Sequence, residues 1–267
     1  MDNLFEYIIG IDQNIALVVL IALFYSLERL LESPHKHQNR IPHFLNNAVF
    51  QIIFFGLNII IAAIQVSLLK WSNANNFGLF HHLAVPFWLQ IILAIAALDL
   101  SSYWVHRTSH RLPLLWRLHR VHHSDNNLDT SSFFRGHPLE GFTFGSGFLL
   151  TAMLLGLEMN VFIFYFIAVL PVLIIQHSNI ETPLWIDKTF GRIFTTPNLH
   201  KIHHHRDQHF TDSNYADIFI LWDKLFGTYT YAPVSEIEFG LREFDGAGKQ
   251  TWWYLLISPF VNIKREK

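Results

Sequence analysis

Long apolar stretches alternate with short polar connections along the chain. Residues 14–30 and 44–69 are long enough to cross about 30 Å of hydrocarbon as helices, and a third such stretch runs from about Pro86 to Val105. Two shorter stretches, 142–155 and 161–176, flank the connection at 156–160 and predict a helical hairpin. We therefore expect an all-α integral membrane bundle with three long spans plus the hairpin, whose arms either cross a thin bilayer region or stop short of crossing.

Composition and charge agree with a membrane protein. Hydrophobic residues make up 51% of the chain and charged residues only 15%, which is unusual for a soluble enzyme. Positive charges lie between the first two predicted spans and after the third, whereas residues 72–86 contain no Lys or Arg. By the positive-inside rule, the polar region after the third span faces the cytoplasm, so we expect a multi-pass membrane protein with a cytosolic helical cap.

Several function classes are excluded because the chain lacks the residues or motifs that they require. Cysteine is absent, which removes disulfides, thiolate zinc sites and iron–sulfur clusters. The formal net charge is -2 and no basic run occurs, so nucleic acid is not an expected partner. The chain also lacks the H-E-x-x-H zinc-protease helix, the G-x-S-x-G nucleophile elbow and a glycine-rich phosphate loop.

The strongest chemical signal is three clusters of histidine, HRTSH at 106–110, HRVHH at 119–123 and HKIHH at 200–204. Residues three and four apart share a face of a helix, so each cluster is expected to offer two or three imidazoles to one point. Neutral imidazole is a common ligand for transition metals, and this number exceeds the capacity of one ion. We predict two metal ions, bound by His106, His110, His119, His122, His123, His200, His203 and His204.

Other polar residues are candidates for roles around such a centre. His137 and His177 lie at the two ends of the hairpin, where each is either a ligand or an interface residue. Asp99 and Tyr103 continue the helical stripe of His106, and Asp99 is expected to accept a ligand's ring N–H or to face a water-filled crevice. Segments 211–215 and 221–227 either hydrogen-bond the ligands or only pack. The residues expected to support the ligands are Asp99, Tyr103, Glu140, Asn179 and Asp223.

The remaining histidines are expected to have no metal. His35, His37, His43, His81 and His82 lie in polar connections, and we expect them to face solvent or lipid headgroups. His205 lies on a different face from His200, and His209 is expected at the surface.

Taken in order, these motifs resemble those of the membrane-bound fatty acid hydroxylase and sterol desaturase superfamily. The carrying residues are HRTSH, HRVHH, FRGHPLE at 134–140, QHSN at 176–179, TPNLHKIHH at 196–204 and LWDKLFGTY at 221–229. The resemblance covers about residues 85–230 and looks closest to the bacterial sterol desaturase-like branch, which implies a bacterial inner membrane. It divides the chain into N-terminal spans (1–84), a catalytic region (85–230) and a cytosolic or interfacial tail (231–267). The first box is H-x-x-x-H rather than H-x-x-x-x-H, which argues against fatty acid 2-hydroxylation.

The resemblance implies an oxidoreductase that hydroxylates or desaturates a membrane lipid, such as a sterol, alkyl or acyl lipid. It implies two non-haem irons, O2 as cosubstrate and an external electron donor such as a cytochrome b5-like protein or a ferredoxin. It adds His177 to the eight clustered ligands, adds His137 through a His-Pro motif found in some branches, and implies no catalytic residue beyond the ligands.

Two other classes remain as alternatives. A zinc-dependent membrane hydrolase also uses histidine-bound metal and activates water without O2. A metal transporter would place its histidines in mid-span rather than at span ends, where these clusters lie.

Overall fold

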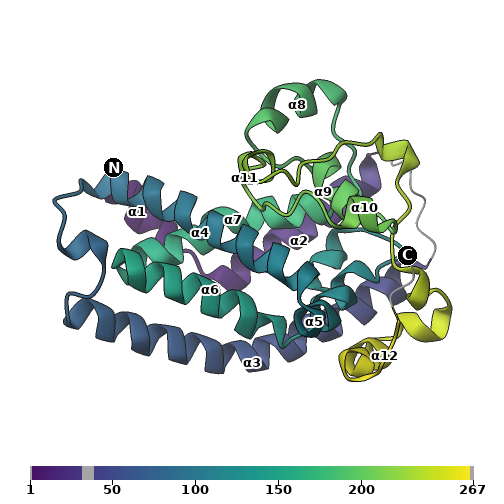
Figure 1. Cartoon of the computed structure of the whole chain (residues 1–267), viewed down its shortest axis with the longest axis horizontal. Coiled ribbons are helices and arrows are strands. Elements are labelled where there is room, and N and C mark those ends of the chain that lie inside the picture. The colour runs from purple at the N-terminus through teal and green to yellow at the C-terminus, as the bar shows by residue number, and fades with distance from the viewer. Residues whose placement is uncertain (1, 32–38, 265–267) are drawn as a thin grey trace.

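Long helices run side by side along the long axis of the molecule, and a cap of shorter helices covers one end (Figure 1). The computed structural model describes residues 2–31 and 39–264. Its α-helices are α1 (Asp2–Ile9), α2 (Gln13–Leu30), α3 (Arg40–Ala74), α4 (Phe87–Arg111), α5 (Pro113–His123), α6 (Glu140–Leu155), α7 (Met159–His177), α8 (Leu184–Thr189), α9 (Pro197–His203), α10 (Gln208–Thr211), α11 (Leu221–Leu225) and α12 (Trp252–Ile257). Short 3-10 helices are η1 (Leu79–His81), η2 (Thr130–Phe134), η3 (Phe190–Arg192), η4 (Val234–Glu236), η5 (Arg242–Phe244), η6 (Ala247–Gln250) and η7 (Ser258–Phe260). Within the described ranges, β structure is limited to one isolated bridge, between His205 and Phe239.

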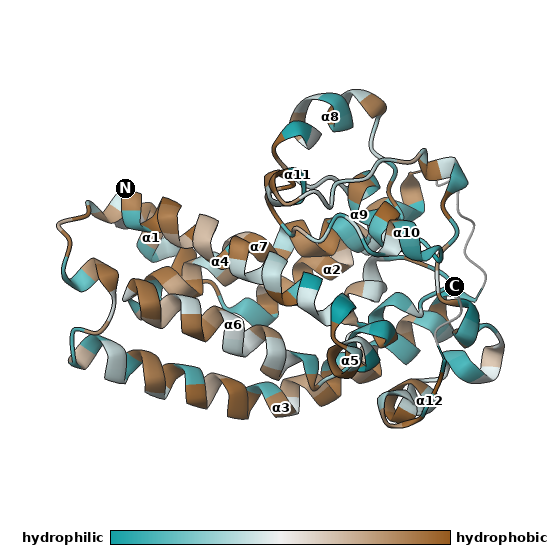
Figure 2. Ribbon diagram, in the orientation of Figure 1, coloured by the Kyte–Doolittle hydropathy of each residue, from teal (hydrophilic) through white to brown (hydrophobic). Residues whose placement is uncertain are grey.

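The all-α membrane architecture predicted from the sequence is confirmed. Helices α2, α3, α4 and α7 are long and apolar enough to cross a membrane, and α6 is a shorter apolar helix of 16 residues. Figure 2 shows hydrophobic residues concentrated on these helices. Val18 and Ile52 are 68% and 72% exposed, as expected for side chains that face lipid rather than a protein core. The chain is therefore a multi-pass membrane protein, and the second hairpin arm, α7, has the length of a span.

The hairpin turns at Gly156, which adopts a left-handed conformation (φ 71°) after α6 and so ends that helix. Gly78, in the connection between α3 and α4, also has positive φ (116°) and packs directly against this turn. A Cβ atom at Gly78 would lie 2.3 Å from the backbone nitrogen of Gly156. Behind this contact, Leu69, Leu98 and Leu157 form a fully buried core between the long helices.

The cap is built from α5, η2 and the segments after α7, and it is more polar than the bundle (Figure 2). His43, on α3, connects this helix to the cap. The sequence predicted that His43 faces solvent or lipid headgroups, and this prediction is wrong. Its ring nitrogens lie 2.8 Å from Asp125 Oδ1 and 3.1 Å from Asp129 Oδ2. Burial alone would raise the pKa of Asp125, but His43 and Arg135 hold it well below its usual range. The expectations for His35 and His37 lie outside the described residues.

Candidate metal centre

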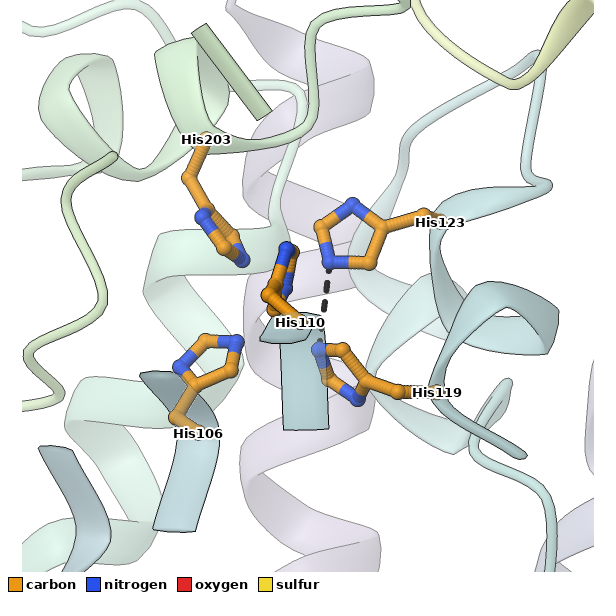
Figure 3. A group of neighbouring side chains, drawn as sticks. All are labelled: His106, His110, His119, His123 and His203. Atoms are coloured by element: carbon orange, nitrogen blue, oxygen red, sulfur yellow. Dashed lines mark hydrogen bonds between the residues drawn. The ribbon is translucent and has the colours of Figure 1, made fainter. Parts of the chain in front are cut away.

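A sharp break between α4 and α5 brings the first two histidine clusters face to face. Leu112 separates the helices and has an extended backbone (φ -87°, ψ 122°), which is the conformation that the following Pro113 favours. Pro113 then begins α5, where its missing N–H costs no hydrogen bond. As a result, His106 and His110 on α4 point toward imidazoles on α5 across a short gap (Figure 3).

Nine imidazoles gather into two compact groups, and within each group the ligand nitrogens all lie within 4.8 Å of one another. The first group combines α4, α5 and α9, and the second combines α5, α7 and α9. The first consists of His106, His110, His119, His123 and His203, and the second of His122, His177, His200 and His204. Figure 3 shows the five rings of the first group turned toward a common point. Each cluster offers two imidazoles to one point, as the spacing predicted, and in the two H-x-x-H-H clusters the third imidazole joins the other group.

The helix geometry explains how these two clusters divide. Residues four apart lie on the same face, whereas adjacent residues project about 100° apart. On α5, His119 and His123 therefore face the first group and His122 faces the second. In the third cluster His200 and His204 face the second group and His203 faces the first. Each of these two clusters thus contributes a pair of imidazoles to one group and a single imidazole to the other.

Most rings of both groups are buried, and this fixes their charge state. Burial, reinforced by His119, lowers the pKa of His203 to about 3. Burial and neighbouring histidines also hold the pKa values of His122, His123, His200 and His204 well below the usual range. These imidazoles are therefore neutral at neutral pH, which is the form that binds metal.

Hydrogen bonds at Nδ1 orient the rings. Backbone carbonyls lie 2.7 Å from His106 Nδ1 (Tyr215 O), 2.6 Å from His203 Nδ1 (Ser213 O) and 2.6 Å from His177 Nδ1 (Leu173 O). A carbonyl accepts only, so in each of these rings Nδ1 carries the proton and the Nε2 lone pair is available. Nε2 of His106 and of His203 is buried with no hydrogen-bond partner among the described residues. Such buried lone pairs fit a metal ion.

Two carboxylates complete the ring orientation in the first group. Glu140 Oε1 lies 2.6 Å from His119 Nδ1, and Asp212 Oδ1 lies 3.1 Å from His110 Nδ1. The segment from Asp212 to Tyr215 thus contacts three rings of the first group, through one carboxylate and two carbonyls. Asp223 holds this segment by accepting the backbone N–H groups of Tyr215 (2.8 Å) and Ala216 (2.9 Å).

Comparison with known proteins identifies the group to which this chain belongs. A model of the fatty acid hydroxylase family matches residues 91–228, slightly more than half of the chain and all nine of the gathered histidines. The chain belongs to the fatty acid hydroxylase family. The three histidine clusters, the hairpin and the Asp212–Asp223 region all lie within the matched part.

Curated relatives in this family carry out several lipid reactions. The chain is similar to alkylglycerol monooxygenase of Danio rerio (32% identity over 173 residues, 62% of this chain and 35% of that protein). It is also similar to an ornithine lipid hydroxylase of Rhizobium tropici (28% over 228 residues, 81% and 65%) and to a Delta(7)-sterol 5(6)-desaturase of Gibberella zeae (25% over 211 residues, 74% and 60%). The chain spans about a third of the length of the alkylglycerol monooxygenase. No solved structure matches it.

Two of the expected supporting residues lie elsewhere. Asp99 accepts the backbone N–H groups of Ile218 and Phe219 and the indole N–H of Trp222, at 2.9 to 3.0 Å. These three donors occupy its oxygens, so Asp99 anchors the loop after Tyr215 instead of accepting a ligand's N–H. The Tyr103 hydroxyl contacts Thr228 (2.9 Å) and Arg107 (3.0 Å) and touches no ligand ring. Asp99 and Tyr103 do share a face of α4 with His106, as predicted. They contact the segment after Tyr215, however, and not the histidine rings.

His137 and Asn179 complete the set of predicted residues. His137 belongs to neither group. Its Nε2 lies 3.1 Å from the Leu256 carbonyl, and its Nδ1 accepts the N–H of Leu139 (3.3 Å). The backbone N–H of Asn179 donates to Glu28 (2.9 Å), which ties the end of α7 to α2. The structure therefore brings His177 to the centre but not His137.

The sequence analysis missed Asp212 as an individual residue, although it included the surrounding turn among the candidates. Asp212 lies 102 positions from His110, and no local pattern joins the two. The carbonyls of Leu173, Ser213 and Tyr215 carry no side-chain signal at all, because every residue has a carbonyl.

A cavity of about 280 Å³ adjoins both groups. His106 and His119 of the first group line it together with His122, His177 and His200 of the second. The rest of the lining is largely aromatic or aliphatic and includes Phe54, Phe133, Phe134, Phe144, Phe148 and Leu173. An apolar chain that enters this cavity lies beside both groups of imidazoles.

Proposed function

We propose that this protein is an oxidoreductase that hydroxylates or desaturates a membrane lipid with O2 at a histidine-bound di-iron centre. The observation that carries the proposal is the pair of imidazole groups opening onto one apolar cavity. Family membership supports the reaction class, and the named activities of the relatives support a lipid substrate. Within the family, we propose that the chain belongs to a bacterial sterol desaturase-like branch.

Two iron ions would be held by the nine imidazoles, five in one group and four in the other. Nitrogen-only sites suit iron, zinc and copper, and the choice of iron rests on the proposed reaction. When bound, the metals would supply the redox chemistry that O2 activation requires. The protein's own part is to hold neutral imidazoles in fixed orientations. Glu140 and Asp212 contribute by hydrogen bonding to Nδ1 of His119 and His110.

The apolar cavity supports a substrate with a hydrocarbon chain. Its aromatic lining excludes water from the centre and presents one segment of the chain to the imidazoles. Excluding water matters because a reactive oxidant next to an unactivated C–H bond would otherwise be lost to side reactions.

A second groove supports entry of this substrate from the bilayer. This groove, of about 430 Å³, lies between α2 and α3 and is lined by apolar residues such as Leu17, Val18 and Phe44. It shares Gln51 and Phe134 with the cavity at the metal groups. We propose that a lipid chain reaches the centre sideways from the membrane, past these two side chains. The centre would face the cytoplasm, where a separate electron donor reduces it.

Metal content and oxygen dependence test the proposal together. Protein purified in mild detergent from iron-supplemented cells is analysed by elemental mass spectrometry and then incubated with a bacterial lipid extract, a reductant and O2. We expect about two irons per chain and a lipid that gains one oxygen atom or loses two hydrogen atoms only under O2. One tightly held zinc and a hydrolysed lipid formed without O2 would instead identify the zinc-dependent hydrolase.

A further inference from the structure

One pair of polar residues in the apolar cavity has no role in binding metal. Ser102, on α4, donates a hydrogen bond of 2.5 Å to Oδ2 of Asp217, and both residues line the cavity. The second carboxyl oxygen, Oδ1, has no hydrogen-bond partner among the described residues. Ser102 lies one helical turn before His106, which is about 6 Å along the helix axis. The pair therefore sits beside the imidazoles, at the bundle side of the cavity.

No basic side chain of the cavity lining balances this carboxyl group. None of the described residues that line the cavity is Lys or Arg. Burial, together with the nearby carboxylate of Asp99, raises the pKa of Asp217 to about 7. In either protonation state a polar oxygen of Asp217 remains available to the cavity.

The backbone around Asp217 is firmly held, so the pair does not move away from the cavity at low cost. The Asp217 carbonyl accepts a hydrogen bond from the side chain of Gln176. The next two backbone N–H groups, of Ile218 and Phe219, donate to Asp99. Asp217 is only partly buried and lines the cavity, so a bound group that donates a hydrogen bond to Oδ1 would add to the binding free energy.

We propose that the Ser102–Asp217 pair binds a hydroxyl group of the lipid substrate and so fixes which carbon lies beside the histidines. The inference rests on the proposed function and narrows its substrate to lipid alcohols. A hydroxyl group both donates and accepts, so it satisfies Asp217 in either protonation state. A phosphate or carboxylate group would find no Lys or Arg in the lining, and neither can donate a hydrogen bond to an ionised Asp217. The hydrogen-bonding capacity of the pair therefore matches an alcohol.

Binding of two matched probes tests the inference without turnover. The metal-loaded protein is placed in phosphatidylcholine nanodiscs that contain either cetyl alcohol or cetyl methyl ether, and thermal unfolding is followed as a function of probe content. We expect the alcohol to bind roughly ten-fold more tightly than the ether, the value of one net hydrogen bond. The ether keeps the chain and an acceptor oxygen but cannot donate to Asp217.

Substitutions at the pair connect this preference to the proposed residues. Asp217→Leu should abolish the preference for the alcohol, and Ser102→Ala and Asp217→Asn should reduce it. Asp245→Leu, at a carboxylate that is 49% exposed, should leave the preference unchanged and serves as the matched control. Ser102→Ala and Asp217→Asn keep the test valid if Asp217→Leu does not fold.

Two outcomes overturn the inference: equal binding of alcohol and ether by the unaltered protein, or an unchanged preference in all three variants of the pair. The result is separable from the proposed function, because it requires no turnover. A protein that holds zinc and consumes no O2 would disprove the oxygenase proposal, whatever the probe preference. Two bound irons with equal probe binding would disprove only the alcohol site.

Discussion

His122 and His123 are adjacent in the sequence, but their imidazoles belong to different metal-binding groups. Their ring centroids lie 5.5 Å apart and their planes are nearly perpendicular, at 84°. His123 approaches His203 of the first group, and His122 approaches His177 of the second. Helix α5 therefore supplies imidazoles to both groups, and any movement of α5 changes both at once.

The division of the histidines predicts which metal each substitution removes. His203→Ala removes a ligand from the first group and His200→Ala removes one from the second. Each variant should retain about one metal ion instead of two and lose lipid oxidation. Elemental mass spectrometry of the purified variants measures the ratio, and His209→Ala, at an exposed histidine outside both groups, is the control. Retention of both metals by either variant would refute the assignment.

Glu140 should tune the metal rather than bind it. Its carboxylate lies 2.6 Å from Nδ1 of His119, so Glu140→Gln keeps the shape but removes the charge that strengthens the imidazole as a ligand. We expect metal affinity or activity to fall roughly 10- to 100-fold. Competition with a chelator of known affinity measures the change. An unaltered affinity would show that this contact does not influence the centre.

Asp99 should contribute to stability rather than to metal binding. Asp99→Leu leaves three donors without an acceptor, the N–H groups of Ile218, Phe219 and Trp222. Each unsatisfied buried donor costs about 1–3 kcal/mol, so the midpoint of thermal unfolding should fall clearly. The protein that remains folded should still hold two metals. A variant of unchanged stability that has lost its metal would restore a direct role for Asp99 at the centre.

The contact between Gly78 and Gly156 should not tolerate a side chain. In Gly78→Ala, the new Cβ would lie 2.3 Å from Gly156 N, and the backbone conformation (φ 116°, ψ 160°) adds about 1–3 kcal/mol of strain. Thermal unfolding in detergent should therefore occur at a lower temperature. Gly56→Ala is the matched control, because a Cβ there meets nothing within 4 Å and alanine favours a helix. Equal stability of the two variants would contradict the packing of the hairpin turn.

Hydropathy and helical spacing are local properties of the chain. The helices and the histidine pairs that depend on them were therefore predictable from the sequence. The apolar stretches anticipated α2, α3, α4 and the hairpin, and the glycine turn at Gly156 lies where the polar connection indicated. The pairing of His106 with His110 also followed from spacing, because both lie on one uninterrupted helix. His43 was misassigned, because its acidic partners, Asp125 and Asp129, lie more than 80 positions away.

The sequence by itself determined that this chain is helical, that it spans a membrane and that it carries enough imidazoles for two metals, since each of these follows from residues close together along the chain. Only the tertiary structure decided how the imidazoles divide, that Asp212 supports His110, and that Asp99 holds a loop instead of a ligand. Those outcomes depend on the angle that Leu112 and Pro113 impose between α4 and α5 and on the path of the segment after α9. No periodicity records such long-range geometry, because it arises only when distant segments pack together.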